Sequence, residues 1–494
     1  MMEKEEIRTE KVYLKFPMDH AALFACLLGF VLWAYLLHLK YVLFAFCDWD
    51  MALYAQAMQS LCHGTSYASL FGTSFLVDHS HYIAFLLTPI YALFPHPLTL
   101  INLELLSFFG GGFVFYKIAS KTVGEVTAFI LMIIYLMHPA NIFMLFFEFH
   151  FESLAPGFIF LMFYFYGEKK WVPFMITALI ILLIKENMAL IVAMFGVYGM
   201  LFNKENRWRW GGIVFCIGVL YFVVNMFVLI PYFRRDLVHS SSMYWVICYN
   251  HFGNTPQEIL FNLFFHPIQA LKGVCTAVNL NYIKNCIGPF LFLSIFGSQS
   301  LIGLPILAQN LLSSVPTLHT IYYHYAATLI PFAAMGALEA LGFIKTRVRL
   351  GVFMVFVVLI AYTAGGFVSD YWLAWKYNIR SWDDSLASVR QSMIEQIPKD
   401  SSVVASFDFL SHLTDHKNLY AFYSVWRDAN DFTGERPFKM PGNIQYALID
   451  FDDPWLLAEL HAHPREALSH MDKFFIRYKW KIKSRHGRII LFKR

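Results

Sequence analysis

Long apolar segments alternate with short polar stretches over residues 21–368. A helix needs roughly 20 apolar residues to cross the hydrocarbon core of a bilayer. We expect such helices near residues 22–45, 98–117, 123–138, 153–167, 172–184, 187–202, 211–231, 289–298, 300–313, 322–343 and 349–368. Several are shorter than this length, so they extend further or are broken and buried among neighbours. The pattern predicts an all-α polytopic membrane protein with about eleven transmembrane helices.

One further apolar segment, 81–94, is short and ends in Pro95-His96-Pro97. We interpret it as a re-entrant or interfacial helix. The distribution of Lys and Arg supports this interpretation, because cytoplasmic loops are rich in both residues. If 81–94 does not cross, the basic arm before the first helix and all basic short loops fall on one side. The loops 46–80, 139–152 and 314–321 contain no Lys or Arg and fall on the other side.

This topology divides the chain into three parts. Residues 1–20 form a cytoplasmic arm, and residues 21–368 form a transmembrane domain with outer loops 46–97 and 232–288, the second expected to hold helices lying on the membrane surface. Residues 369–494 lack long apolar runs. There, 401–407, 418–424 and 445–451 resemble strands, 382–397 and 454–471 show helical periodicity, and a terminal hairpin turns at His486-Gly487. We expect a small α/β domain outside the membrane.

Composition agrees with a multi-pass protein of the plasma (inner) membrane, with its N-terminus in the cytoplasm and its C-terminal domain outside. Of 494 residues, 58% are hydrophobic and only 15% are charged, against about 25% charged in soluble domains. The partner this predicts is the lipid bilayer, and we expect no nucleic acid partner. The seven cysteines form no CxxC pair, and any disulfide among them cannot be assigned from sequence.

Polar residues that could carry chemistry gather in the loops predicted to lie outside. Asp48-Trp49-Asp50 follows the first helix and brings two carboxylates together at a water interface, which suits a divalent cation or a base. The alternative is an interfacial turn with solvated acids. Asp78-His79-Ser80-His81 suits metal binding or proton transfer, although Asp78 could simply cap the segment 81–94.

Three other stretches predicted to lie outside also contain polar or charged residues that could carry chemistry. Glu148-Phe149-His150-Phe151-Glu152 would place three polar groups on one side if the segment is extended. The alternative is a purely structural set of satisfied polar groups. Lys185-Glu186 sits between two apolar runs, and charges beside membrane helices mark functional sites unless the pair is an exposed turn. His319 and the run Tyr322–Tyr325 lie at another outer helix end, where tyrosines ordinarily anchor a helix to the interface.

These residues resemble the domain-of-unknown-function family 2079 of polytopic membrane proteins. The match is carried in order by Asp50 with Gln56, Gly64, His79 before Leu87-Thr88-Pro89, Phe149-His150, Lys185-Glu186, His324-Tyr325 with Pro331, and 397–406. It spans roughly residues 40–490. Each motif is weak alone, and their order makes the match specific. Two residues depart from the family pattern: Trp49 stands where Phe is usual, and His81 stands where Pro is usual.

That family in turn resembles the membrane glycosyltransferases of the GT-C fold, which carry a catalytic acid in the first outer loop. Asp50 occupies that place, and Glu148/His150 lie where many such enzymes have a second acidic element. The resemblance implies an inverting transfer of sugar from a polyprenyl-phosphate donor to an unidentified acceptor at the outer membrane face. It is an analogy of architecture, and fold does not fix function.

We predict roles for individual residues on this basis. Asp50 and Glu186 would be catalytic, and a divalent metal ion (Mg, Mn or Zn) would be held by Asp48, Glu148 and His150. The predicted substrate-binding residues are Gln56, His79, Lys185, Arg234, Arg235, His324 and Tyr325. Two other classes of function stay open: a transporter or ion-coupled carrier, and a non-catalytic metal-binding or scaffold protein. Transport is less favoured because the acids cluster at one surface rather than along a pathway.

Overall fold

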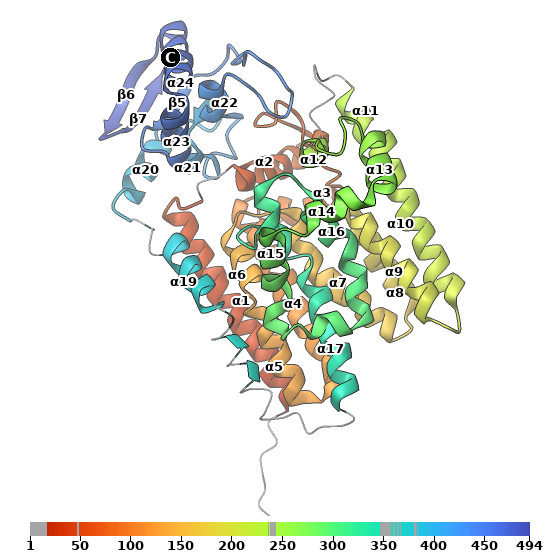
Figure 1. Cartoon of the computed structure of the whole chain (residues 1–494). Helices are drawn as coiled ribbons and strands as arrows, with labels where there is room; N and C mark the ends of the chain where they lie inside the picture. Colours follow the sequence, from red (N-terminus) through yellow and green to blue (C-terminus); the bar gives the residue numbers. More distant parts are fainter. Residues whose placement is uncertain are drawn as a thin grey trace, which may run out of the picture.

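The computed structural model describes residues 17–46, 49–235, 237, 244–345, 357, 358, 361, 362, 365, 367–379, 382 and 384–494. These residues form a long bundle of helices with a smaller sheet-containing domain at one end (Figure 1). The bundle holds α1 (Met18–Val42), α4 (Pro97–Val123), α5 (Glu125–Leu136), α6 (Pro139–Phe146), α7 (Ala155–Gly167), α8 (Trp171–Ile184), α9 (Met188–Phe202), α10 (Ile213–Val224), α11 (Ile230–Arg234), α16 (Leu304–Leu312), α17 (Ile330–Lys345) and α19 (Phe367–Asn378).

Four helical segments among the described residues are long and apolar enough to cross a membrane. They are Met18–Val42, Pro97–Val123, Trp208–Arg234 and His324–Ile344, and α5 with α6 makes a fifth if this pair, bent by 46°, is one span. The helices predicted over 153–167, 172–184 and 187–202 are present as α7, α8 and α9. With 13 to 15 residues each, they fall short of a full span. The multi-pass architecture is confirmed, whereas about eleven full-length spans are not seen in this part of the chain.

The transmembrane helix predicted over 289–298 is wrong. This segment forms two short 3₁₀ turns, Gly288–Phe290 and Leu293–Phe296. Between them, Leu291 and Phe292 both adopt the left-handed conformation, with φ of 57° and 58°, and this interrupts a right-handed helix. The prediction over 300–313 is met by a 3₁₀ turn followed by α16. The helix predicted over 349–368 lies largely outside the described residues.

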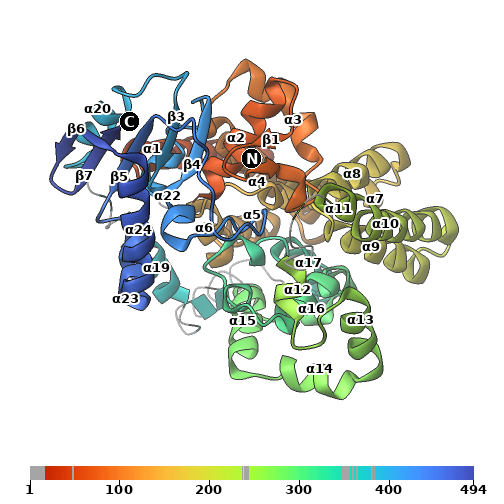
Figure 2. The same ribbon diagram turned by 90° about the horizontal axis from the view of Figure 1, so that it is seen from above.

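The two long loops predicted to lie outside, 46–97 and 232–288, contain mainly short helices, with a two-stranded hairpin of β1 (Tyr67–Ala68) and β2 (Thr73–Ser74) in the first. α2 (Asp50–Cys62) and α3 (Ile83–Leu93) follow α1, and α3, with 11 residues, is too short to span. The loop 232–288 contains α12 (Tyr244–Tyr249), α13 (Pro256–Phe265), α14 (Pro267–Val274) and α15 (Ala277–Ile287). In Figure 2 these helices project from the edge of the bundle. Phe264 and Ile268 are 79% and 71% exposed, which suits contact with lipid at the membrane surface.

The C-terminal domain is a five-stranded sheet with helices against it. Its strand order is β4-β3-β5-β7-β6, in which β3 pairs in parallel with β4 and β5 while β7 runs antiparallel to β5 and β6. The elements are α20 (Ala387–Ile394), β3 (Ser402–Ala405), α21 (Phe407–Leu410), β4 (Asn418–Ala421), α22 (Phe422–Arg427), β5 (Tyr446–Asp450), α23 (Pro454–Ala462), α24 (Pro464–Tyr478), β6 (Lys481–His486) and β7 (Ile489–Lys493). The predicted strands and terminal hairpin are confirmed.

This domain docks on the end of α1 and on the first outer loop. The Trp49 ring packs against Phe407 and Tyr423, with ring centroids 5.9 and 5.0 Å away. The Ser69 hydroxyl donates to the Leu419 carbonyl and accepts from the Leu419 amide, each at 2.8 Å. The residue before Asp50 is therefore held by the C-terminal domain, so the helical bundle and this domain together set the position of the carboxylate.

Candidate functional site

Asp50 and His150 form an ion pair where α2 begins. Asp50 is the first residue of α2, and its Oδ2 lies 3.2 Å from His150 Nε2. His150 Nδ1 lies 3.0 Å from the Glu148 carbonyl, so both ring nitrogens have partners and the ring orientation is fixed. The side chain of Asp50 is 23% exposed, whereas that of His150 is 7% exposed. The Asp50 carboxylate is thus accessible from solvent, whereas the His150 imidazole is buried.

A second histidine connects this pair to buried charges. The rings of His150 and His324 stack with centroids 3.5 Å apart. His324 Nε2 in turn lies 3.9 Å from Glu152 Oε1, which also accepts a hydrogen bond from Lys185 Nζ. The side chains of Glu152 and Lys185 are 7% and 10% exposed. These contacts form a continuous chain from Asp50 to Lys185 across segments nearly 300 residues apart in sequence.

Glu186 organises the end of the first outer loop. Its Oε1 lies 2.8 Å from His79 Nδ1, and its Oε2 accepts from the Ser80 amide at 3.0 Å. Both carboxylate oxygens are therefore engaged in holding the Asp78–His81 turn. The catalytic role predicted for Glu186 stays a prediction, and its visible contacts anchor the loop.

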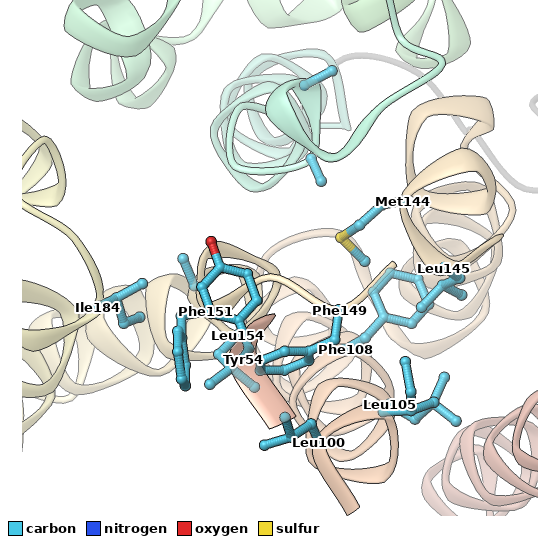
Figure 3. Packing of buried hydrophobic residues seen from close by; sticks show 14 of the residues in the cluster. Tyr54, Leu100, Leu105, Phe108, Met144, Leu145, Phe149, Phe151, Leu154 and Ile184 are labelled. Carbon is cyan, nitrogen blue, oxygen red and sulfur yellow. The ribbon is translucent and has the colours of Figure 1, made fainter. Parts of the chain in front are cut away.

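A group of packed aromatic rings contacts these polar groups. Figure 3 shows Tyr54 packed among Phe149, Phe151 and Leu154. The Tyr54 ring also meets the rings of His150 and His81, with centroids 5.5 and 5.4 Å away. Because packed aromatic rings exclude water and lower the local dielectric constant, they strengthen the ion pairs above them.

The surroundings shift the pKa values of the loop residues. Burial lowers the pKa of His150, but the Asp50 carboxylate outweighs it and raises that pKa to about 9. Burial likewise opposes ionisation of Glu186, yet His79 and Lys185 bring its pKa down to about 2. Burial disfavours the charged form of Lys185, but Glu152 and Glu186 raise its pKa. His81 is buried, and its pKa falls to about 4. At neutral pH the site therefore contains charged His150 and Lys185 beside ionised Glu186.

A cavity of about 100 Å³ opens next to these charges. Its walls carry His79, Glu152, Lys185, Glu186, Asn187, Gln309, Asn310, His324 and Tyr325, and they also include apolar residues of α9, α12 and α16. Asp50 is not among the residues that line this cavity, but it is linked to the cavity wall through the stacking of His150 on His324. Lys185 is the cation in that wall, and the Asp50 side chain, 23% exposed, is accessible from solvent.

The other predicted site residues lie around this cluster. Glu148 Oε2 accepts from the Met51 amide at 2.8 Å and so supports the start of α2. Gln56 bonds to Ser69 Oγ and the Leu70 amide, which places it in the scaffold of the outer loop. Arg234 donates to the Val77 carbonyl at 2.8 Å, whereas Arg235 is exposed and lies over the Tyr232 ring. Asp48 lies outside the described residues.

Sequence reasoning assigned no individual role to two buried acids. Glu152 is the last polar residue of the alternating stretch 148–152, and this alternation is the only sequence feature that marks it as a candidate site residue. Glu104 is a carboxylate inside the apolar helix α4, 2% exposed, whose Oε1 has no hydrogen-bond partner within the described residues. A lone acid in a membrane helix is itself a sign of function, so this residue could have been singled out from the sequence.

Two of the three predicted metal donors, Glu148 and His150, lie within the described residues. Among the described residues, no group of three or more His, Cys, Asp or Glu side chains has the arrangement needed to hold one. His150 uses both ring nitrogens within the protein, and one Glu148 oxygen binds a backbone amide. The predicted divalent metal, which also involves Asp48, stays a prediction, and no chemical step below depends on it.

Comparisons with known proteins bear on this arrangement. The family described as "Predicted membrane protein (DUF2079)" matches residues 40–471. Among solved structures, the chain is similar to the crystal structure of ArnT from Cupriavidus metallidurans bound to undecaprenyl phosphate, a protein of the GT-C fold. The TM-score is 0.50 at 12% identity, with 94% of this chain and 97% of that chain covered. No curated protein matches the sequence. At this identity, the likeness to ArnT concerns the fold alone.

Proposed function

We propose, from the premise that the chain belongs to the DUF2079 family of predicted membrane proteins, that it is a glycosyltransferase of the GT-C type. Its donor would be a sugar linked to a polyprenyl phosphate, and its acceptor would be reached at the outer face of the membrane. One observation carries the proposal. In a fold similar to that of a protein bound to undecaprenyl phosphate, Asp50, His150, His324, Glu152 and Lys185 form one connected cluster beside a cavity.

Asp50 would act as the general base. His150 holds Oδ2, so the other carboxylate oxygen is directed to an acceptor hydroxyl, from which it takes the proton. The acceptor oxygen then attacks the anomeric carbon and forms the new glycosidic bond. The bond from that carbon to the phosphate oxygen breaks, and its electron pair leaves with the polyprenyl phosphate. A single displacement of this kind inverts the anomeric carbon.

Lys185 has the chemistry to stabilise the leaving phosphate. Its ammonium group is charged and lines the cavity, and a fixed cation lowers the energy of negative charge that develops in the transition state. Arg234 lies against the same loop through Val77 and would add positive charge at the outer end of its helix. α13 and α14, which carry the exposed side chains of Phe264 and Ile268, project from the edge of the bundle (Figure 2), and a lipid donor would enter beside them.

The direct test is donor consumption by the full-length protein in proteoliposomes. A panel of radiolabelled polyprenyl-phosphate sugars is supplied with a membrane extract as the source of acceptor, and the release of free polyprenyl phosphate is measured. Glycosyl transfer predicts stoichiometric release for at least one donor. Uptake of a labelled solute with no donor consumed would instead support the transporter alternative and contradict the proposal.

A further inference from the structure

The outer α/β domain has its own topological switch point. β3 lies between β4 and β5, and all three strands run parallel, so the chain leaves β3 on one side and later returns to pair on the other. In doubly wound sheets, ligands bind in the crevice outside the carboxyl ends of the two strands at such a point. Here those two strands are β3 and β5. The carboxyl end of β5 is Asp450, and Asp408 follows shortly after β3.

A cavity of about 630 Å³ lies at this position. This size is within the range of about 300–1,000 Å³ that small-molecule sites occupy. Its floor is the switch point, and its opposite wall is formed by Phe44, which follows α1, by Tyr377 of α19 and by Trp382, which follows α19. The site is thus formed jointly by the two domains, and it is separate from the cavity next to Lys185.

The polar lining contains Asn378 and His486, and its Asp and Arg side chains form pairs of opposite charge. The Arg390 guanidinium bridges Asp408 and Asp450 at 2.8 and 3.0 Å. At the rim, Arg488 Nε lies 3.1 Å from Asp452 Oδ1, and both side chains are 58% exposed. This arrangement offers hydrogen-bond donors and acceptors in alternation beside aromatic faces.

Other ligand classes fit this lining poorly. Its acids are held by arginines, and no metal-binding group of three is found among the described residues, which disfavours a cation. Three carboxylates beside two guanidinium groups disfavour a phosphate or another anion. A neutral sugar fits the charged groups of the lining, because its hydroxyls both donate and accept hydrogen bonds. It also fits the aromatic side chains, because the apolar faces of a sugar ring stack on them.

We propose that this interdomain cavity is a saccharide-binding site. Asp452, Arg488 and Arg390 hydrogen-bond to the hydroxyls, and Trp382 and Tyr377 stack on the ring faces. The cavity is close to the candidate active site, because Phe407, next to Asp408, packs on Trp49, next to Asp50. The saccharide is therefore either a distal part of the acceptor, an assignment that rests on the proposed function, or a separate glycan that binds the outer domain.

The test measures saccharide binding rather than transfer. The full-length protein in nanodiscs is titrated with maltotriose, chitotriose, mannotriose and galactotriose, and binding is followed by calorimetry. Trp382→Ala and Asp452→Asn change half-buried or exposed side chains, and the unfolding temperature of each variant checks that it is folded. Trp208→Ala, which changes a side chain 77% exposed at the opposite end of the molecule, and Asp472→Asn, an exposed position on α24, are the matched controls.

We expect at least one trisaccharide to bind, with affinity about tenfold weaker in Trp382→Ala and Asp452→Asn and unchanged in the controls. Binding should persist in Asp50→Asn, so failure of the transfer mechanism is separable from failure of this site. A rise in KM for the acceptor in Trp382→Ala, with the donor KM unchanged, identifies the ligand as part of the acceptor, and an unchanged acceptor KM identifies a separate glycan. Absence of binding by all four probes, or equal binding by both cavity variants and wild type, overturns the proposal.

Discussion

At the residue scale, His150 determines the charge state around Asp50. The imidazole is buried, stacks on His324 and faces the Asp50 carboxylate at 3.2 Å. A protonated His150 holds the Asp50 carboxylate in a fixed orientation through this ion pair. The charge of His150 therefore affects both the geometry of the site and the stability of the fold.

His150 should make protein stability depend on pH. Its pKa is raised from 6.5 to about 9 in the folded protein. The stabilisation is therefore fully present below about pH 6.5 and is lost as pH rises through about 9. We expect thermal unfolding in detergent to show wild type more stable than His150→Gln by at most a few kcal/mol at pH 6, with the difference shrinking towards pH 9.5. A difference independent of pH would show that His150 is not charged in the folded state.

The Glu152–Lys185 pair should show strong coupling. Removing one partner of a buried ion pair leaves an uncompensated charge and costs about 3–5 kcal/mol. We expect Glu152→Gln alone to lower the unfolding temperature strongly and Glu152→Gln with Lys185→Met to recover a large part of the loss. The exposed pair Lys169 and Glu205 supplies the matched cycle, in which coupling should be below about 1 kcal/mol. Additive effects at Glu152 and Lys185 would contradict the assigned pairing.

At the element scale, α4 and α7 position the buried acids. α4 carries Glu104, and Glu152 lies in the 3₁₀ turn Phe151–Leu154 that leads into α7. The two helices approach closely because Gly111 and Gly157 face each other: a Cβ on Gly157 would lie 2.3 Å from the Ser107 carbonyl oxygen. Small residues at such crossings allow membrane helices to pack backbone to backbone.

Substitution at this crossing should therefore separate the helices. Gly157→Ala forces α7 away from α4, and overpacking of this kind costs typically 1–3 kcal/mol. We expect a lower unfolding temperature and reduced transfer activity, because Glu152 moves with α7. Gly110→Ala is the matched control, since a Cβ there meets nothing within 4 Å and alanine favours a helix. Equal unfolding temperatures for the two variants would rule out the close crossing.

At the scale of the whole molecule, the C-terminal domain and the site lie at the same end of the bundle (Figure 1). The distribution of Lys and Arg predicts that this end is outside the cell. Such an orientation would give the candidate site access to an extracytoplasmic acceptor, and it would put the basic loops near Lys204 in the cytoplasm.

Cysteine labelling of intact cells tests this orientation. In a background without native cysteines, Gly442→Cys in the outer domain should react with a membrane-impermeant maleimide. Lys204→Cys, at the opposite end of the bundle, should react only after the cells are permeabilised. Position 442 is suitable because a side chain there meets nothing within 4 Å. The reverse labelling pattern would contradict the outward-facing site.

The end of the bundle that holds the site and the strands of the C-terminal domain could both be predicted from the sequence. Loop charge and chain order placed Asp50, His150, Lys185 and His324 at one end of the bundle, and they do converge there. The strands of the outer domain were readable because they are short apolar runs bounded by turn residues. Both predictions depend on short stretches of sequence or on the order of the segments along the chain, and neither requires knowing how the helices pack.

The partners within the site could not be predicted in the same way. The stacking of His150 on His324 and the pairing of Lys185 with Glu152 join segments that are far apart in sequence, and such contacts depend on how helices pack. The helix predicted over 289–298 was wrong because the prediction used apolar composition alone. Leu291 and Phe292 adopt left-handed backbone conformations, which composition does not reveal.

The central claim is that Asp50 is the base in sugar transfer from a polyprenyl-phosphate donor. The most direct measurement is the single-turnover rate of transfer in proteoliposomes for wild type, Asp50→Asn and the control Asp472→Asn, with polyprenyl phosphate binding measured on the same samples. We predict that Asp50→Asn lowers the rate by about 10²–10⁴-fold, that its lipid binding is retained, and that Asp472→Asn behaves as wild type. Full transfer activity in Asp50→Asn would contradict the account.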